Sequence, residues 1–251
     1  MRTSRPFCRV PEEKGPGGRG PVSASPFRFV WASVLALALL CCLAGSGLAA
    51  GRVVLAPLSG SVGVQMEQFV ERVVRRAEEE RAGLVVFELD TPGGLLGATH
   101  GIVQTILASR VPVAVWVPPG GRAASAGAFI MQAAHVAAMA SGTNVGAAHP
   151  VVASGRDLPD DDMKKKVVND LGAQMRSLTQ LRGRNQSAAQ RMIEDSLSLT
   201  AHEALAEGAI DLVADDLRTL LEAAVGRTVT IDSGPVRIEA EPDAAVVLVE
   251  M

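Results

Sequence analysis

The sequence predicts an α/β domain built from parallel β–α–β units. From residue 53 onward, short apolar runs alternate with segments whose apolar residues recur at helical spacing, which is the pattern of such a domain. Glycine and proline clusters follow several of the apolar runs, as expected where strands end in loops. With 251 residues, 48% of them hydrophobic, the chain is long enough to bury a sizeable core.

Apolar runs of four to eight residues rich in valine, leucine and isoleucine predict the strands, because buried parallel strands read as continuous apolar stretches. Alternation is weaker near the C-terminus, where only short β-like pieces are expected. In chain order the expected strands are Val53–Leu58, Leu84–Leu89, Val111–Val117 and Ile210–Val213, followed by the pieces Thr228–Ile231 and Ala244–Val249.

Helices are predicted where apolar residues recur every three or four positions with charges between them. A Thr200–Glu203 capping box opens a short helix that Gly208 can close. Val151–Met163 has no apolar period and contains three consecutive aspartates, so it is expected to be a mobile surface loop. The other expected helices are Met66–Ala77, one around Ile102–Leu107, the apolar segment Ala128–Ala138 after Ser125, Val167–Leu181 ended by a turn at Arg182–Asn185, and Asp216–Ala224.

Composition excludes several functional classes. Aromatic residues make up only 3% of the chain and no basic cluster is interleaved with rings, which argues against a nucleic-acid binder. All three cysteines, Cys8, Cys41 and Cys42, lie in the first fifty residues. The rest of the chain therefore has no disulfide, no thiolate zinc site and no cysteine nucleophile.

Residues 1–50 have the order of a secretory signal. They carry six basic residues against two glutamates, and the basic residues precede an apolar run, Phe29–Ala44, that ends in small residues. We expect an exported, extracytoplasmic and membrane-associated protein. An uncleaved membrane anchor is the alternative, since the apolar stretch approaches the roughly 20 residues that span a bilayer. A translation start placed too early is a further alternative.

Two loops that follow strands carry the candidate chemistry. Asp90–Gly94 follows a buried strand, so it lies at the carboxyl edge of the sheet, where open α/β folds bind ligands. Ser125 stands at a helix start among alanines and glycines, open to an incoming carbonyl, and the amide after it and the glycine amides of the earlier loop are suited to stabilising an oxyanion. The alternatives are a tight turn for the first loop and an ordinary N-cap for Ser125.

A serine nucleophile needs a base. The histidines are His100, His135, His149 and His202. The H-E-x-x-H metal motif is absent at His202, and we expect His135 to be a satisfied core residue on the apolar helix after Ser125. His149 follows a small-residue loop and is a plausible base. Lys164–Lys166 precede the long helix and can equally be a solvated surface patch.

Five motifs, in order, resemble the NfeD-type membrane serine proteases of the Clp protease and crotonase superfamily, which are related to signal peptide peptidase A. The resemblance runs from about Arg52 to Asp232. The motifs are Asp90–Gly94, Ala123–Gly127, Gly142–Pro150, Lys166–Asp170 and Ser177–Asn185.

The resemblance implies a Clp protease/crotonase-like layered fold of β–α–β units and a serine endopeptidase with a Ser–Lys dyad. Ser125 matches the nucleophile, Lys166 the general base, and the amides of Gly94 and Ala126 the oxyanion positions. It further implies cleavage of apolar segments, a stomatin-like membrane protein as substrate, a homodimer or larger homo-oligomer, and no metal or organic cofactor. The expected domains are a leader at 1–50, a protease domain at 51–232, and a β-like tail at 233–251 that ends near where longer family members enter the membrane.

The choice of base stays open at this stage. On a helical wheel Lys164 aligns with Val168, Leu171 and Met175, whereas Lys166 lies on the far side. Either the helix begins after Lys166, or its face toward another subunit matters, and Lys164 is the reserve.

Two other functions remain possible. One is a Ser–His–Asp hydrolase in which His149 is oriented by Asp170 or Asp195. The other is a non-catalytic scaffold that only binds a membrane partner.

Overall fold

The computed structural model describes residues 51–151, 160–240 and 246–249. Contacts divide the chain into Met1–Leu48 and Ala49–Met251, and all described residues belong to the second unit. The predicted leader at 1–50 and residues 152–159 of the predicted loop lie outside the described residues.

A six-stranded sheet forms the centre of the domain, and every neighbouring pair in it is parallel, as predicted. Its central strands are buried on both faces, which is why they read as unbroken apolar runs in the sequence. The strands, in sheet order, are β11 (Val246–Leu248), β1 (Val53–Ser59), β2 (Leu84–Asp90), β3 (Val113–Val117), β5 (Val136–Met139) and β8 (Leu212–Val213).

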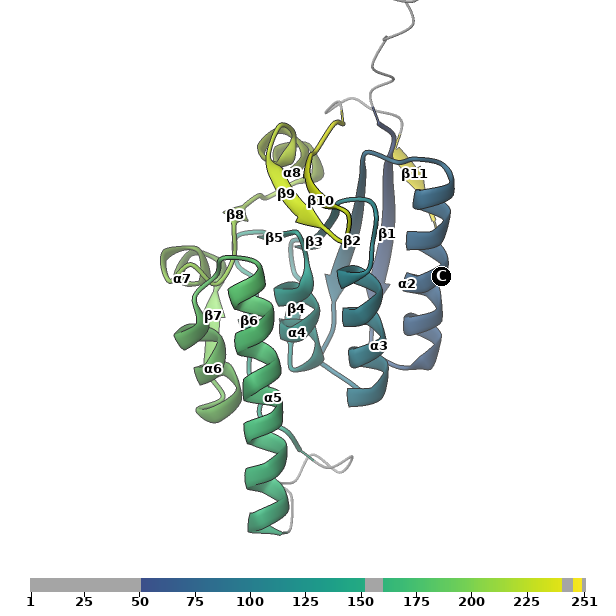
Figure 1. The fold of residues 1–251 in the computed structure, drawn as a ribbon. Helices are drawn as coiled ribbons and strands as arrows, with labels where there is room; N and C mark the ends of the chain where they lie inside the picture. Colours follow the sequence, from purple (N-terminus) through teal and green to yellow (C-terminus); the bar gives the residue numbers. More distant parts are fainter. Residues whose placement is uncertain (1–50, 152–159, 241–245, 250–251) are drawn as a thin grey trace, which may run out of the picture. The chain divides into compact units, whose positions relative to one another are not determined.

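Helices α2 (Val64–Glu79) and α3 (Leu96–Leu107) lie side by side along one face of this sheet (Figure 1). The buried face of α2 is the apolar set expected from its periodicity: Met66, Phe69, Val70, Val73, Val74 and Ala77. The other face packs against α8 (Leu217–Ala224) and, through Val229, the hairpin of β9 (Thr228–Ile231) and β10 (Gly234–Arg237). The sheet therefore has a core on each side.

The apolar segment after Ser125 divides into two elements, which corrects the prediction of one helix over Ala128–Ala138. Helix α4 covers Ala126–Ala133, and β5 begins at Val136, with His135 in the turn between them. Small apolar residues suit a helix or a strand. The second half of the segment is a strand because it pairs with β3, where Ala114 lies opposite Val136. His135 is therefore not on the helix.

A second, small sheet was not predicted. It consists of β4 (Arg122–Ala124), β6 (Asn144–Gly146) and β7 (Ser198–Thr200). Strand β4 runs parallel to β6, and β6 runs antiparallel to β7. Three-residue strands leave too little periodicity to be recognised in a sequence, yet this sheet holds the segment that ends at Ser125.

Helix α5 begins at Asp161 and ends at Leu181, so the predicted loop Val151–Met163 extends too far. Asp160 caps the helix by accepting hydrogen bonds from the amides of Asp162 and Met163, and further acidic residues fill its first turn. Carboxylates stabilise a helix N-terminus, which explains why a run of aspartates starts this helix.

Two further helices follow α5. They are α6 (Gln186–Glu194) and α7 (Ala201–Ala206), and the capping box of Thr200 and Glu203 opens α7 as predicted. Gly208, two residues past the end of α7, has φ +67. None of the helices in the described ranges combines the length and the apolar character needed to cross a membrane.

Candidate active site

The loop that follows β2 lies beside the strand that leads to Ser125. The Thr91 amide donates to the Arg122 carbonyl at 2.8 Å, and the Ala124 amide donates to the Thr91 carbonyl at 3.1 Å. The side chain of Asp90 accepts a hydrogen bond from the Arg122 amide. The two loops singled out in the sequence therefore meet at the carboxyl edge of β2, where such folds place ligands.

Ser125 occupies a sharp turn between β4 and α4. Its backbone has φ 54 and ψ −111, a conformation that costs a non-glycine residue free energy and that tends to persist at functional sites. The turn is held by a 2.8 Å hydrogen bond from the Ser125 amide to the Gly146 carbonyl. Ser125 is the N-cap residue of α4, but its side chain makes no capping hydrogen bond, so the interpretation of its hydroxyl as an ordinary helix cap is wrong.

Gly93 packs directly against Ser125. A Cβ atom at Gly93 would lie 2.6 Å from the serine Cβ and 3.1 Å from its Oγ, and the glycine has φ +119. The Gly93 carbonyl accepts from Val62 and its amide donates to Thr91 Oγ1. Because position 93 has no side chain, the loop can lie directly against the serine, which is half-buried.

The amides of Gly94 and Ala126 flank this contact. Gly94 follows the glycine that touches Ser125, and Ala126 is the first residue of α4. Neither amide donates to a backbone or side-chain acceptor among the residues that the structure describes. Free amides at a helix N-terminus attract negative charge.

The three lysines lie in the first turns of α5, which extend beyond the neighbouring helices in Figure 1. The helix begins before them, so the expectation that it starts after Lys166 is wrong. Lys164 is half-buried, whereas Lys165 and Lys166 are exposed, as the helical wheel predicted. In the described part of the chain no hydrogen bond or ion pair joins Lys166 to Ser125.

His149 lies across from α5 on a cavity of about 490 Å³ that Lys164, Lys165 and Glu194 also line. Its Nδ1 lies 2.8 Å from the Ile193 carbonyl. A carbonyl only accepts, so Nδ1 carries the proton and donates. Asp170 and Asp195 do not occupy this position, so the expected carboxylate is replaced by a backbone carbonyl.

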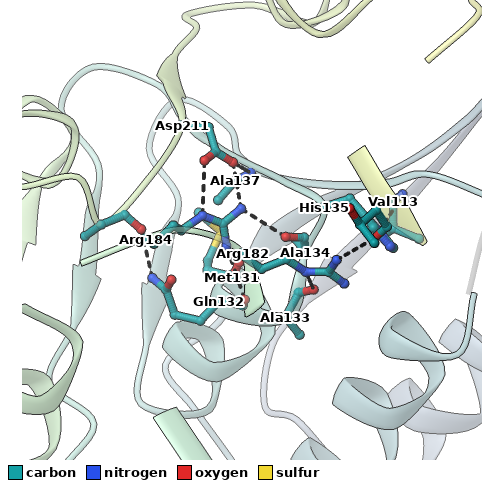
Figure 2. Close-up of polar contacts among 12 residues, drawn as sticks. Val113, Met131, Gln132, Ala133, Ala134, His135, Ala137, Arg182, Arg184 and Asp211 are labelled. Carbon is teal, nitrogen blue, oxygen red and sulfur yellow. Dashed lines mark hydrogen bonds and ion pairs between the residues drawn. The ribbon is translucent and has the colours of Figure 1, made fainter. Parts of the chain in front are cut away.

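Two arginines lie at the other end of α4, and the sequence analysis gave them no role, although it placed them in the turn Arg182–Asn185 and in the motif Ser177–Asn185. Arg184, whose side chain is 2% exposed, forms a 2.6 Å ion pair with Asp211. It also donates to the carbonyls of Met131, Gln132 and Ala134 (Figure 2). Cations at a helix C-terminus satisfy its last carbonyls and oppose its dipole.

Arg182 completes this cap by donating from Nε to the Ala133 carbonyl at 2.8 Å. Burial, followed by the nearby charge of Arg184, lowers the pKa of Arg182 to about 10. No local sequence signal marks these contacts, because the partners lie about fifty residues away along the chain. The helix that starts at Ser125 is therefore anchored at its far end by two arginines.

His135 meets the expectation of a satisfied core residue only in part. Its Nδ1 accepts a 3.1 Å hydrogen bond from the Val113 amide, whereas its buried Nε2 has no partner among the described residues. Burial, with the charges of Arg182 and Arg184, lowers the pKa of His135 to about 3. The ring is therefore neutral near pH 7, with its hydrogen on Nε2.

No group of three His, Cys, Asp or Glu side chains is placed to hold a metal ion within the ranges that the structure covers. The candidate groups at this edge are the Ser125 hydroxyl and the backbone amides of Gly94 and Ala126.

Comparisons with known proteins bear on the family and the fold. The family profile described as NfeD1b, N-terminal domain, matches residues 52–232. The Membrane-bound protease PH1510 of Pyrococcus horikoshii is 38% identical over 194 residues, which cover 77% of this chain and 44% of that protein. The chain thus spans less than half the length of this curated relative.

Solved structures give the same result. The 1510-N membrane-bound stomatin-specific protease, in a variant with a serine replaced by alanine, superposes with a TM-score of 0.73 at 34% identity and covers 81% of this chain and 99% of its own. A second variant, with a lysine replaced by alanine and in complex with a substrate peptide, has the same TM-score and identity and covers 81% of this chain and 93% of its own.

ClpP1 from Listeria monocytogenes matches with a TM-score of 0.53 at 17% identity, over 64% of this chain and 91% of that one. At this identity the likeness concerns the fold alone. The predicted Clp-protease-like α/β fold is therefore confirmed.

Proposed function

The chain belongs to the family of NfeD1b N-terminal domains, and on this premise we propose that it is a serine endopeptidase whose nucleophile is Ser125. The observation that carries the proposal is the strained turn between β4 and α4, which presents a serine whose side chain caps no helix amide. Strained strand-to-helix turns of this kind expose nucleophilic serines in other hydrolases. The proposed protease domain is residues 51–232.

In this proposal Lys166 is the general base. The relative studied as a serine variant and as a lysine variant has these two residues separated in sequence by the same number of positions as Ser125 and Lys166. Along the sequence, Lys164 lies two positions closer to Ser125 than Lys166 does, and Lys165 lies one position closer. This spacing favours Lys166 over Lys164 as the base.

A lysine can act as a base only when its pKa falls toward neutrality. A free amine titrates near 10.4, and lowering that value by about three units requires roughly 4 kcal/mol of destabilisation of the charged form. Lys166 is exposed in the single chain, so a covering group has to supply the desolvation. We propose that a second copy of the chain, in a homodimer or larger assembly, together with the bound peptide, covers this face of α5.

The backbone amides of Gly94 and Ala126 are the proposed oxyanion hole. Both lie at the serine, and neither donates to an acceptor in the described part of the chain, so both are available to a carbonyl oxygen that becomes negative. Preorganised donors of this type contribute about 3 kcal/mol each to transition-state stabilisation. No cofactor is needed for this mechanism.

The proposed substrates are apolar segments of membrane-associated proteins, with a stomatin-like membrane protein as one candidate. The solved relative is named as stomatin-specific. Exposed Leu95 and Leu96 directly follow Gly94 and offer apolar surface beside the proposed oxyanion hole. We further propose that the protein is exported and acts at a membrane, as its relative is named membrane-bound.

His149 is the alternative base. Because its Nδ1 donates to the Ile193 carbonyl, the ring is held with Nε2 as the atom that can accept a proton. This tautomer is the one that a Ser–His mechanism needs. Loss of cleavage in Lys166→Ala or in His149→Ala separates the two mechanisms.

The test of the proposal is cleavage of an apolar peptide, with detergent-solubilised full chain, by the parent and by Ser125→Ala. We expect the variant to lose cleavage and labelling by a fluorophosphonate probe while its thermal unfolding is unchanged. Ser187→Ala, at an exposed serine in α6, is the matched control and should cleave like the parent. Cleavage that persists in Ser125→Ala would exclude this serine as nucleophile, and an inactive parent would favour the scaffold.

A further inference from the structure

A polar cavity of about 340 Å³ lies at the end of α4 opposite Ser125. Strand β9 and the last residues of α5 form its walls, and the turn that contains His135 contributes to it. The proposed peptidase mechanism uses none of these residues. The side chains that carry charge or a free donor here are Arg182, Arg227, His135 and Asp211.

The charges around this cavity do not balance. Asp211 is occupied elsewhere, because it pairs with Arg184 and accepts a hydrogen bond from the Ala137 amide. Arg182 and Arg227 form no ion pair with any residue in the described ranges. Two guanidinium groups therefore line this cavity together with one carboxylate, which already pairs with Arg184.

These guanidinium groups are anchored but not saturated. Arg182 uses Nε and Nη1 for the carbonyls of Ala133 and Thr230, and Arg227 uses Nε for the carbonyl of Ala223. Their remaining N–H groups have no acceptor among the residues that the structure resolves. Arg182 therefore keeps Nη2, and Arg227 keeps both terminal nitrogens, to donate to an oxyanion.

His135 supplies an independent observation. The residue is 7% exposed and lines the cavity, and since Nδ1 accepts from Val113, its Nε2 carries the hydrogen. Within the described ranges that buried N–H has no acceptor. Leaving such a donor unsatisfied costs free energy, and a native structure with one calls for an explanation such as a ligand.

We propose that this cavity binds a small phosphate-class oxyanion through Arg182 and Arg227, with the ring N–H of His135 as a third donor. The donors come from the end of α5, the residue before β9 and the α4–β5 turn, so they approach from different directions. A tetrahedral phosphate offers acceptors in more directions than a planar carboxylate. The cavity also exceeds the size of the bare ion, so a small phosphomonoester fits the same site.

Occupation of this site would act on α4. Arg182 caps the Ala133 carbonyl at the C-terminus of the helix that begins beside Ser125. An anion that fixes Arg182 in place therefore stabilises this cap, and binding raises the stability of the folded chain by mass action.

Calorimetric titration of the detergent-solubilised full chain with inorganic phosphate tests the site, with glycerol phosphate and acetate as the other arms. We expect saturable binding of phosphate and glycerol phosphate, and weaker binding of acetate. Arg227→Gln should weaken phosphate binding about tenfold, because it removes one of the two charged donors. Arg227 is exposed, so the substitution should leave the core intact. Arg237→Gln, an exposed arginine of the same hairpin that does not line the cavity, should change the Kd less than twofold.

NMR of nitrogen-labelled protein measures the contact between phosphate and His135. Phosphate should shift the His135 Nε2–H resonance in the parent and not in Arg227→Gln. Absence of saturable phosphate binding at millimolar concentration would overturn the proposal. Equal weakening by Arg227→Gln and Arg237→Gln would also overturn it, because that result indicates general electrostatic attraction.

Discussion

Gly93 lies against Ser125 so closely that a Cβ atom on the glycine would come within 2.6 Å of the serine Cβ. The two residues are far apart in sequence, and the pairing of Thr91 with β4 brings them together. This contact ties the shape of the β2–α3 loop to the position of the hydroxyl.

Gly93→Ala is expected to lower kcat/KM for an apolar peptide by at least about tenfold. The new methyl group meets Ser125, and φ +119 is a conformation that alanine rarely adopts. Peptide cleavage and thermal unfolding measure the two effects. Gly97→Ala is the control, because Gly97 lies in α3 with open space around it, and alanine there should stabilise the chain by about 0.5 kcal/mol. Full activity of Gly93→Ala would mean that the contact is not required.

Lys166→Ala is expected to reduce cleavage by at least about a hundredfold, since removal of a general base typically costs this much. Lys164→Ala and His149→Ala should retain most of the activity, and Lys165→Ala controls for the loss of one charge on α5. The measurement is kcat/KM with each variant. If cleavage survives in Lys166→Ala but disappears in His149→Ala, the mechanism is Ser–His and the dyad proposed above is wrong.

Arg184→Met should destabilise the fold by about 3 kcal/mol or more. The substitution leaves Asp211 without its ion-pair partner and removes the donors for three carbonyls at the end of α4, and breaking a buried pair from one side is costly. Urea unfolding measures the change. Arg76→Gln breaks the exposed pair with Glu80 and should have little effect. Similar losses in both variants would contradict the buried role of Arg184.

The pH dependence of stability should contain a contribution from His135. Burial and the nearby arginines lower its pKa to about 3 in the folded chain, whereas an unfolded histidine titrates near 6.5. Between these values only the unfolded state binds the proton, so the free energy of unfolding falls as the pH drops below about 6.5, by up to about 1.4 kcal/mol per pH unit.

His135→Asn removes this titration and keeps an acceptor for the Val113 amide. Its unfolding free energy, measured by urea titration between pH 4 and pH 6.5, should therefore depend less steeply on pH than that of the parent. Carboxylates contribute equally to both proteins. Parallel curves for the two would show that His135 is protonated in the folded state.

The fold was predictable because its signals are local. The apolar face of α2, the parallel strands β1, β2 and β3, and the capping box of Thr200 and Glu203 all follow from residues close together in the chain. The end of α4 was not predictable in this way. Its alanine-rich segment suits a helix or a strand, and only the pairing of Val136 with Ala114 ends the helix.

The candidate site likewise has features that the sequence predicted and features that required the structure. The motifs around Ser125 and Gly94 were visible in the sequence. So was the position of Lys164 on the buried face of α5. The uncapped serine turn, the contact with Gly93 and the start of α5 before the lysines required the structure. So did the carbonyl that orients His149.

The sequence by itself determined the main parallel strands and the amphipathic helices between them, and it singled out the motifs that hold the candidate residues, since periodicity and motif spacing depend on near neighbours. Only the tertiary structure decided the strain at Ser125, the two arginines that cap the far end of its helix, and the cavity beside them. These features depend on backbone groups that lie tens of residues apart, and the free energy of pairing them is set by the packed fold and not by any local pattern.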